Sequence, residues 1–375
     1  MRIGILGAGQ LAQMMAQAAP GLGLECGFLA PEADACAAPY GRHWQASFDD
    51  QEAVAELVEW ADVITYESEN VSLTLVESLS KQLPVYPPVA ALQAARDRGE
   101  EKQLCRSLGV ATADFALINS SSELPGALAK LGCPAILKTC REGYDGKGQV
   151  WLRSAEDLPA AVEQADATAC VLEAVVPFQR EISAIAARSI DGAVSCFSLS
   201  ENIHREGILR LTINRRNDSQ QQQAEQLIGR LMEQLNYVGV LALELFDVAG
   251  ELRVNEIAPR VHNTGHWTPA GARHSQFEAH LLAVAGRSLP SLDWSNDCAM
   301  INIIGALPDQ TAIDAITGAS LHLYGKSPRP GRKLGHINLI FSPHQSPTQR
   351  LDELRKLLIL VGEGEIADRL EASWL

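Results

Sequence analysis

Two runs of alternating residues joined by a tight turn constrain this chain more than any other feature. The first run contains Glu244, and the second contains Asn255 and Glu256, after a turn centred on Gly250. Side chains alternate between the two faces of a strand, so a loop with an odd number of residues would set Glu244 opposite Glu256. Opposed carboxylates repel unless a cation lies between them, and Mg²⁺ prefers oxygen ligands together with substrate phosphates. The hairpin predicts a Mg²⁺ site, although two solvated glutamates would give the same pattern.

The residues that follow this hairpin are unusually rich in polar side chains. Arg260 carries a planar guanidinium that suits two-point binding of an oxyanion, and it is the best candidate for an anion-binding residue. His262 and His266 could face the same cleft, or one of them could be structural. Trp267 is expected in the core.

A glycine-rich loop forms the second motif. An apolar strand ends in Lys138, and the loop after it carries two further polar residues, Lys147 and Gln149. Glycines let a backbone approach a polyphosphate closely, and the exposed amides can donate to its oxygens. The loop lacks the Gly-Lys-Ser/Thr ending of a Walker A motif, so a plain flexible hairpin is the competing interpretation. Its glycines are Gly143, Gly146 and Gly148.

A third motif joins a short apolar strand to an extended one. The backbone of Ala174 and Val176, just after Glu173, could pair with the edge of an adenine ring. Glu181 opens the next strand and could accept hydrogen bonds from ribose hydroxyls. Either glutamate taken alone would more often be an ordinary surface residue.

The order of these motifs resembles the ATP-grasp superfamily. Further motifs resemble a narrower family within it, the N5-carboxyaminoimidazole ribonucleotide synthetases of purine biosynthesis, and the resemblance spans nearly the whole chain. The motifs that carry it are Gly7 to Leu11, Tyr66 to Val71, Asp97-Arg98, Gly143 to Gln149, Glu201 to Leu209, Tyr237 to Val240, Asn255 to Asn263, and Tyr324 to Lys333. The run from Asn255 to Asn263 is the most specific of them.

The resemblance implies an ATP-driven carboxylation of 5-aminoimidazole ribonucleotide. Bicarbonate would be activated by ATP as carboxyphosphate, and ADP and phosphate would be released. ATP and Mg²⁺, or Mn²⁺ in its place, are the implied cofactors. A cytoplasmic homodimer is expected by analogy with the family.

The resemblance also assigns residues to roles. Glu244 and Glu256 would hold the metal. The implied nucleotide-binding residues are Arg98, Lys138, Gly143, Gly146, Lys147, Gly148, Gln149, Glu173, Ala174, Val176, Glu181, His204, Asn255 and Glu256. The implied substrate-binding residues are Gln10, Leu11, Glu67, Tyr144, Asp145, Arg260, His262, Lys326 and Arg332. Lys138, Tyr144, Asp145 and Arg260 would take part in catalysis.

At 375 residues, the chain is too long for one compact core. We expect an α/β and α+β multidomain protein with an ATP-grasp fold. Its parts would be a Rossmann-like parallel α/β domain (1–97), an ATP-grasp domain (98–290) whose glycine-rich lid subdomain covers about 112–190, and a small β-rich C-terminal domain (291–375).

Charge and composition argue against nucleic acid and membranes as binding partners. A formal net charge of -15 argues against nucleic acid. No stretch approaches the roughly 20 apolar residues of a membrane span. The chain enters a strand at once without a signal peptide, and its eight scattered cysteines favour reduced thiols in the cytosol.

Three other functions fit parts of this sequence. The nearest is another ATP-grasp ligase, such as a formate-dependent glycinamide ribonucleotide transformylase or a biotin carboxylase. A nicotinamide dehydrogenase would explain the Gly-x-Gly-x-x-Ala turn from Gly7 to Ala12, with Glu32 near the ribose, but hydride transfer needs neither a lid nor two metal carboxylates. A non-catalytic ATP-binding module would require the loss of a key residue, and all four are present: Lys138, Glu244, Glu256 and Arg260.

Overall fold

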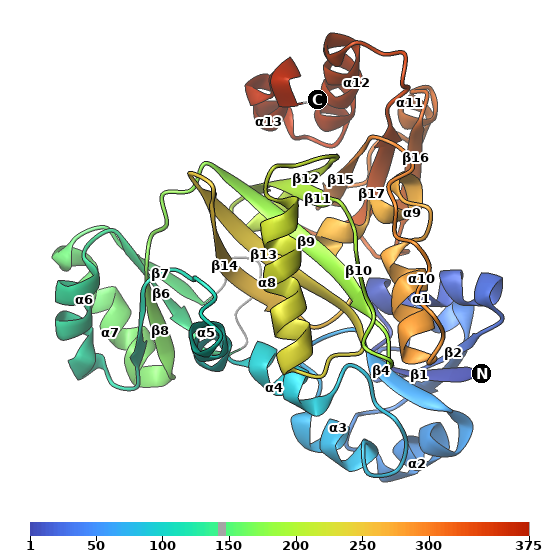
Figure 1. Ribbon diagram of the computed structural model, residues 1–375, viewed down its shortest axis with the longest axis horizontal. Coiled ribbons are helices and arrows are strands. Elements are labelled where there is room, and N and C mark those ends of the chain that lie inside the picture. The colour runs from blue at the N-terminus through green and yellow to red at the C-terminus, as the bar shows by residue number, and fades with distance from the viewer. Residues whose placement is uncertain (142–147, 375) are drawn as a thin grey trace.

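The structure is a computed structural model that describes residues 1–141 and 148–374. Within these residues the strands form three sheets. Figure 1 shows the N-terminal sheet at the lower right, the small sheet at the left, and the central sheet between them. The C-terminal helices lie above the central sheet.

The N-terminal sheet is parallel, as the alternation of strands and helices predicted. Its strands run in the order β3-β2-β1-β4, and every pair is parallel. Ile3 and Ile5 pack in one hydrophobic cluster and Leu6 in another, because helices cover both faces of the sheet. The elements are β1 (Arg2–Leu6), α1 (Gln10–Ala18), β2 (Glu25–Ala30), β3 (Arg42–Gln45), α2 (Gln51–Trp60), β4 (Val63–Tyr66) and α3 (Leu73–Leu79).

Two helices connect this sheet to a small antiparallel sheet, whose strands run in the order β5-β8-β6-β7. Helices α6 and α7 bury their apolar sides against strands β6 and β8, as Leu124, Leu128 and Ala161 show. The elements are α4 (Val89–Arg96), α5 (Arg98–Ser107), β5 (Phe115–Ile118), α6 (Leu124–Leu131), β6 (Ala135–Thr139), β7 (Gln149–Leu152), α7 (Leu158–Ala167) and β8 (Cys170–Ala174).

The central sheet is antiparallel and runs in the order β14-β13-β9-β11-β12-β15-β17-β16, with β10 paired to β9. Its last three strands come from the C-terminal part of the chain, and they join the others through the β12–β15 pair. The strands are β9 (Arg180–Arg188), β10 (Val194–Cys196), β11 (Leu199–Arg205), β12 (Ile208–Arg215), β13 (Gly239–Val248), β14 (Glu251–Ala258), β15 (Cys298–Ile304), β16 (Ala319–Leu323) and β17 (Lys333–Ile340).

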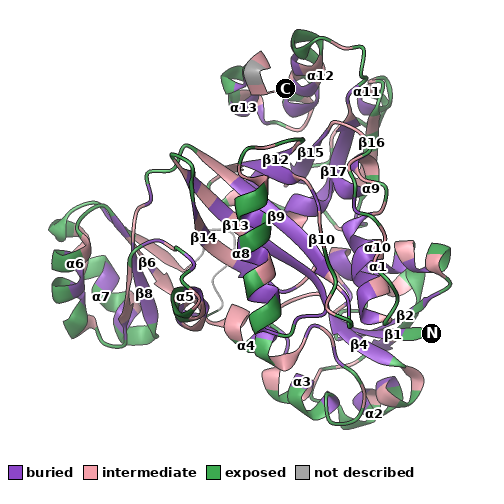
Figure 2. Cartoon of the chain, viewed as in Figure 1, coloured by how far each residue is buried: buried purple, intermediate pink, exposed green. Residues whose placement is uncertain are grey.

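Amphipathic helices cover this sheet. Ala224, Leu227, Ile228 and Leu231 follow helical spacing along α8, so one side of the helix is buried against the sheet and the other is exposed, as Figure 2 shows. The remaining helices are α8 (Gln221–Gln234), α9 (Thr268–Gly271), α10 (Gln276–Val284), α11 (Gln310–Asp314), α12 (Pro347–Leu360) and α13 (Gly364–Arg369). In the part of the chain that the structure describes, no helix is both long and apolar enough to cross a membrane.

Candidate active site

A cavity of about 630 Å³ lies where the three sheets meet. Each sheet contributes to its lining: Gln10 and Glu67 come from the N-terminal region, Lys138 from the small sheet, and Glu244 and Glu256 from the central sheet. The other sequence-predicted residues that line it are Leu11, Arg98, Gln149, Glu173, Ala174, Val176, Glu181, His204, Asn255, Arg260 and His262.

Some predicted residues lie elsewhere. Gly148, Lys326 and Arg332 are outside the set that lines the cavity. Gly143, Tyr144, Asp145, Gly146 and Lys147 fall outside the described residues.

Glu244 and Glu256 are direct partners across strands β13 and β14, as predicted. The predicted cause was wrong, however, because the loop between the strands has an even number of residues: Val248 pairs with Glu251, and only Ala249 and Gly250 lie between them. A β-bulge between Glu244 and Leu245 supplies the odd count. One extra residue, Asn255, lies on β14 at this point, and such bulges re-aim neighbouring side chains.

The paired carboxylates lie in an environment that resists their charge. Burial raises the pKa of Glu244 to about 7, with a further contribution from the charge of Glu256, while nearby His204 opposes the shift. A bound cation would relieve this repulsion. Between them, residues 1–141 and 148–374 contain no group of three or more His, Cys, Asp or Glu side chains placed to hold a metal ion. Mg²⁺ is usually bound by one or two carboxylates and by substrate phosphates, so this carboxylate pair fits Mg²⁺ without a third protein ligand.

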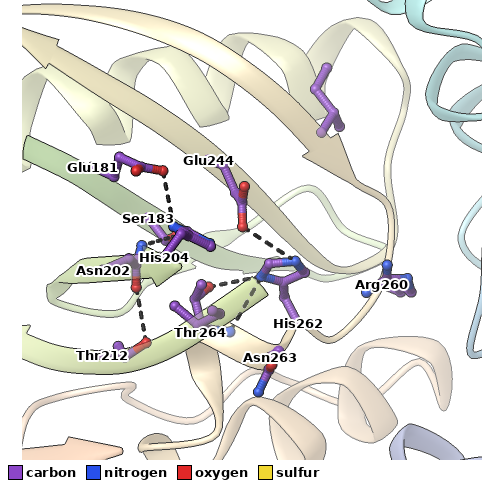
Figure 3. Close-up of polar contacts among 12 residues, drawn as sticks. Glu181, Ser183, Asn202, His204, Thr212, Glu244, Arg260, His262, Asn263 and Thr264 are labelled. Carbon is purple, nitrogen blue, oxygen red and sulfur yellow. Dashed lines mark hydrogen bonds and ion pairs between the residues drawn. The ribbon is translucent and has the colours of Figure 1, made fainter. Parts of the chain in front are cut away.

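Three polar side chains surround Glu244 (Figure 3). Glu181 Oε2 lies 3.0 Å from His204 Nδ1. Burial works against a charged imidazole, but Glu181 and Glu244 outweigh it and raise the pKa of His204. His262 Nε2 lies 3.7 Å from Glu244 Oε1, and burial together with Arg260 keeps the pKa of His262 well below its usual range. The surroundings of these two histidines therefore act in opposite directions: they raise the pKa of His204 and lower that of His262.

Glu173 is a buried carboxylate held by two lysines. Lys138 Nζ lies 3.0 Å from one oxygen and Lys102 Nζ lies 3.2 Å from the other. Burial alone would raise the pKa of Glu173, but the two lysines lower it. Lys102 was missed in the sequence, because a lysine on a polar helix gives no sign that its side chain will be buried.

Arg260 is fixed by Glu69, a second residue that received no role from the sequence. Arg260 Nε donates to Glu69 Oε2 at 2.5 Å, and Nη2 donates to Oε1 at 3.1 Å. Both residues line the cavity. Glu69 belongs to the Tyr66–Val71 motif, which was the only available signal for it.

The predicted substrate residues from the two ends of the chain meet beside the cavity. Lys326 Nζ donates to Gln10 Oε1 at 2.5 Å, across 316 positions of sequence. Glu67 accepts hydrogen bonds from the backbone of Gly9 at 2.5 Å and Ala12 at 2.9 Å. A Cβ on Gly7 would lie 2.6 Å from Glu67, so the turn needs glycine for space as well as for its φ of 103°. Arg332 donates to the carbonyl of Ser327 in its own loop.

Trp267 and His266 are both buried. Trp267 is fully buried, which confirms it as a core residue. His266 also lines the cavity, and burial together with Lys333 lowers its pKa to about 3. Its ring is hydrogen-bonded to Gln276, and the lowered pKa favours the neutral form at the wall of the cavity.

Three protein-family models match successive segments of the chain. A ribonucleotide synthetase preATP-grasp domain matches residues 1–96, an ATP-grasp domain matches residues 103–277, and a phosphoribosylaminoimidazole carboxylase C-terminal domain matches residues 298–350. N5-carboxyaminoimidazole ribonucleotide synthase of Pseudomonas aeruginosa is 44% identical over 358 residues, which are 96% of this chain and 99% of the relative.

The chain also superposes on solved structures of enzymes with similar names. The N5-carboxyaminoimidazole ribonucleotide synthetase of Thermus thermophilus superposes with a TM-score of 0.91 at 42% identity, covering 96% of this chain and 99% of that one. An N5-carboxyaminoimidazole synthase of Aspergillus clavatus, in complex with ADP and 5-aminoimidazole ribonucleotide, superposes with a TM-score of 0.86 at 28% identity, covering 98% and 99%.

Proposed function

This chain belongs to the N5-carboxyaminoimidazole ribonucleotide synthase family of ATP-grasp ligases, and we propose that it activates bicarbonate with ATP to carboxylate the exocyclic amine of 5-aminoimidazole ribonucleotide. The observation that carries this proposal is that one cavity is lined by groups suited to each reactant. They are the paired carboxylates Glu244 and Glu256, Lys138 at the end of β6, Arg260, and the predicted substrate residues Gln10 and Glu67. ATP, bicarbonate and an amine can then react in one shared cavity.

The reaction has two bond-forming steps. A bicarbonate oxygen attacks the γ-phosphorus of ATP, the bond to the bridging oxygen breaks, and ADP leaves. The product, carboxyphosphate, carries phosphate as a leaving group on its carbonyl carbon. The amine attacks that carbon, or CO₂ released from it, the carbon–oxygen bond to phosphate breaks, and one amine proton is released.

Phosphoryl transfer needs mainly positioning and charge neutralisation. Glu244 and Glu256 would hold Mg²⁺, with Asn255 beside them, and the bound ion would neutralise phosphate charge. Lys138 and Arg98, which line the same cavity, hold the ATP phosphates. The ion pair with Lys138 gives Glu173 a role different from contact with adenine: the carboxylate positions the lysine.

The nucleoside lies along the connector between the small and central sheets. Ala174 and Val176 line the cavity, and their backbone pairs with adenine. Phe178 stacks on Phe246 with ring centroids 4.7 Å apart, and both line the cavity. Glu181 accepts from the ribose while it holds His204.

The ribonucleotide lies between the two ends of the chain. Lys326 and Arg332 bind its phosphate, and Gln10 and Glu67 contact its sugar and base. Arg260 binds bicarbonate and then carboxyphosphate, because Glu69 orients its guanidinium beside the cavity. The lid subdomain expected over about 112–190 would exclude water from carboxyphosphate. The enzyme works as a cytoplasmic homodimer, as the family resemblance implies.

The test is ADP release by the purified protein with ATP, Mg²⁺ and bicarbonate, with and without 5-aminoimidazole ribonucleotide. We expect stimulation by the ribonucleotide that also requires bicarbonate and disappears in Glu256→Gln. Stimulation by glycinamide ribonucleotide with formate, and not by this pair, would keep the nucleotide site and overturn the substrate.

A further inference from the structure

The hairpin of strands β11 and β12 enters the cavity at its tip. His204, Gly207 and Leu209 line the cavity, and the turn between the strands consists of Glu206 and Gly207, with φ values of 55° and 73°. This hairpin thus supplies one wall of the nucleotide side.

A β-bulge lies directly behind the tip. Ile203 pairs with Leu211 and His204 pairs with Leu209, so Arg210 is an extra residue on β12. Leu209 consequently faces the cavity, while Leu211 packs in the cluster formed with the C-terminal helices. A bulge interrupts the ladder of backbone hydrogen bonds, so the tip needs another restraint.

Glu363 provides a restraint from the other end of the chain. Its Oε1 accepts from Arg210 Nη1 at 3.0 Å, and its Oε2 lies 3.0 Å from Arg205 Nη1. Arg205 Nη2 also donates to Oε1 at 3.2 Å. The Glu363 carboxylate therefore binds both arginines that flank the tip: Arg210 at the bulge and Arg205 at the end of β11.

This carboxylate is buried and rigidly held. Glu363 is 2% exposed and Arg210 is 5% exposed, so their attraction is screened far less than that of a surface pair. The backbone of Glu363 lies at the junction of α12 and α13: its N–H donates to Leu358, and its carbonyl accepts from Ile366 and Ala367. Figure 1 shows these helices above the β11–β12 hairpin.

We propose that Glu363 is a positioning residue for nucleotide binding, which holds the bulged β11–β12 hairpin so that His204 and Gly207 reach the nucleotide side of the cavity. The proposal rests on the proposed function for its nucleotide, ATP. It gives the C-terminal helices α12 and α13 a part in nucleotide binding, although none of their described residues lines the cavity.

The test compares Glu363→Gln with Glu365→Gln, an identical change two residues away at an exposed position. In Glu363→Gln we expect the dissociation constant for ADP, measured by calorimetry, to rise about tenfold, because substitutions that act on a binding site from a distance change affinity by this order. The KM for ATP should rise in parallel, the KM for 5-aminoimidazole ribonucleotide should stay within about twofold, and Glu365→Gln should match the unmodified protein.

Arg205→Met provides a second variant, because Arg205 is partly exposed and its loss leaves the buried Arg210–Glu363 pair intact. It should weaken ADP binding about threefold even if Glu363→Gln fails to fold. Unchanged ADP binding in both variants, or an equal loss of affinity for both substrates in Glu363→Gln, would overturn the proposal. ADP binding needs no carboxylation, so a failure of the proposed reaction would be seen separately.

Discussion

Arg260 is held by Glu69 through two parallel hydrogen bonds, although 191 positions separate them in the sequence. A third N–H of Arg260 donates to the carbonyl of Val261. These contacts set the plane of the guanidinium, and its remaining N–H groups are available to an anion in the cavity. The pair ties the end of β14 to the segment after β4, and so joins the central sheet to the N-terminal sheet.

Arg260→Lys should lower kcat by about 100-fold or more, because a lysine cannot reproduce two-point binding of an oxyanion. Glu69→Gln should lower kcat less, by about tenfold, since the guanidinium remains but is oriented less firmly. Steady-state kinetics at saturating ATP would measure both. Equal losses of kcat in the two variants would show that Arg260 matters for its ion pair with Glu69 and does not bind the reacting anion.

Glu244→Gln should stabilise the metal-free protein at pH 8. The pKa of Glu244 is raised to about 7, so the folded protein binds more protons than the unfolded chain from about pH 4.5 upward, and stability is lost as pH rises through 7. We expect the Tm of Glu244→Gln to exceed that of the unmodified protein by about 2 °C at pH 8, and the difference to vanish near pH 4.5. Glu251→Gln, at an exposed position of the same hairpin, is the control. A lower Tm at pH 8 would contradict this account.

Lys326→Met should raise the KM for 5-aminoimidazole ribonucleotide by about tenfold or more while leaving the KM for ATP unchanged. The lysine contacts Gln10 beside the cavity, and losing one charged contact to a phosphate costs about 1.5–3 kcal/mol. Lys356→Met, an exposed lysine on α12, removes the same charge elsewhere. If both variants raise this KM alike, the overall charge of the protein and not a phosphate contact would be responsible.

Acidification should destabilise the protein through His280. Its Nε2 bonds to Thr65 at 2.8 Å, and its Nδ1 accepts from the backbone of Val240 at 3.1 Å, an arrangement that requires the neutral ring. Burial lowers the pKa of His280 to about 4, so its contribution is full above pH 6.5 and falls as pH drops toward 4, by about 3 kcal/mol in total. Urea unfolding across this pH range should show a shallower dependence in His280→Gln. An unchanged dependence would assign the loss to other groups.

The sequence predicted the parallel N-terminal unit, the ATP-grasp fold and many of the residues that line the cavity, because these depend on local periodicity and on contiguous motifs. It predicted the Glu244–Glu256 pair for the wrong reason, since a two-residue turn and a bulge together give the register that an odd loop would have given. Strand periodicity alone does not reveal a bulge.

The residues that sequence reasoning missed are partners in long-range ion pairs. Lys102 on α5 pairs with Glu173 on β8, and Glu363 lies 153 positions from Arg210. Each is an ordinary charged residue on a helix or loop until the fold buries it. Their pairing depends on how the sheets pack, and no short-range pattern records that.

The β12–β15 pair, which joins the C-terminal strands to the central sheet, has a consequence for how this enzyme can change in evolution. The loop that carries Lys326 lies between β16 and β17, on the same sheet as Glu244 and Glu256. A recombination break between β12 and β15 would join strands from two parents within one hydrogen-bonded sheet, and a poorly matched β15 would leave the edge of β12 exposed. Exchange of the C-terminal region therefore has to preserve this strand pairing, whereas point substitutions in its loops leave the pairing untouched.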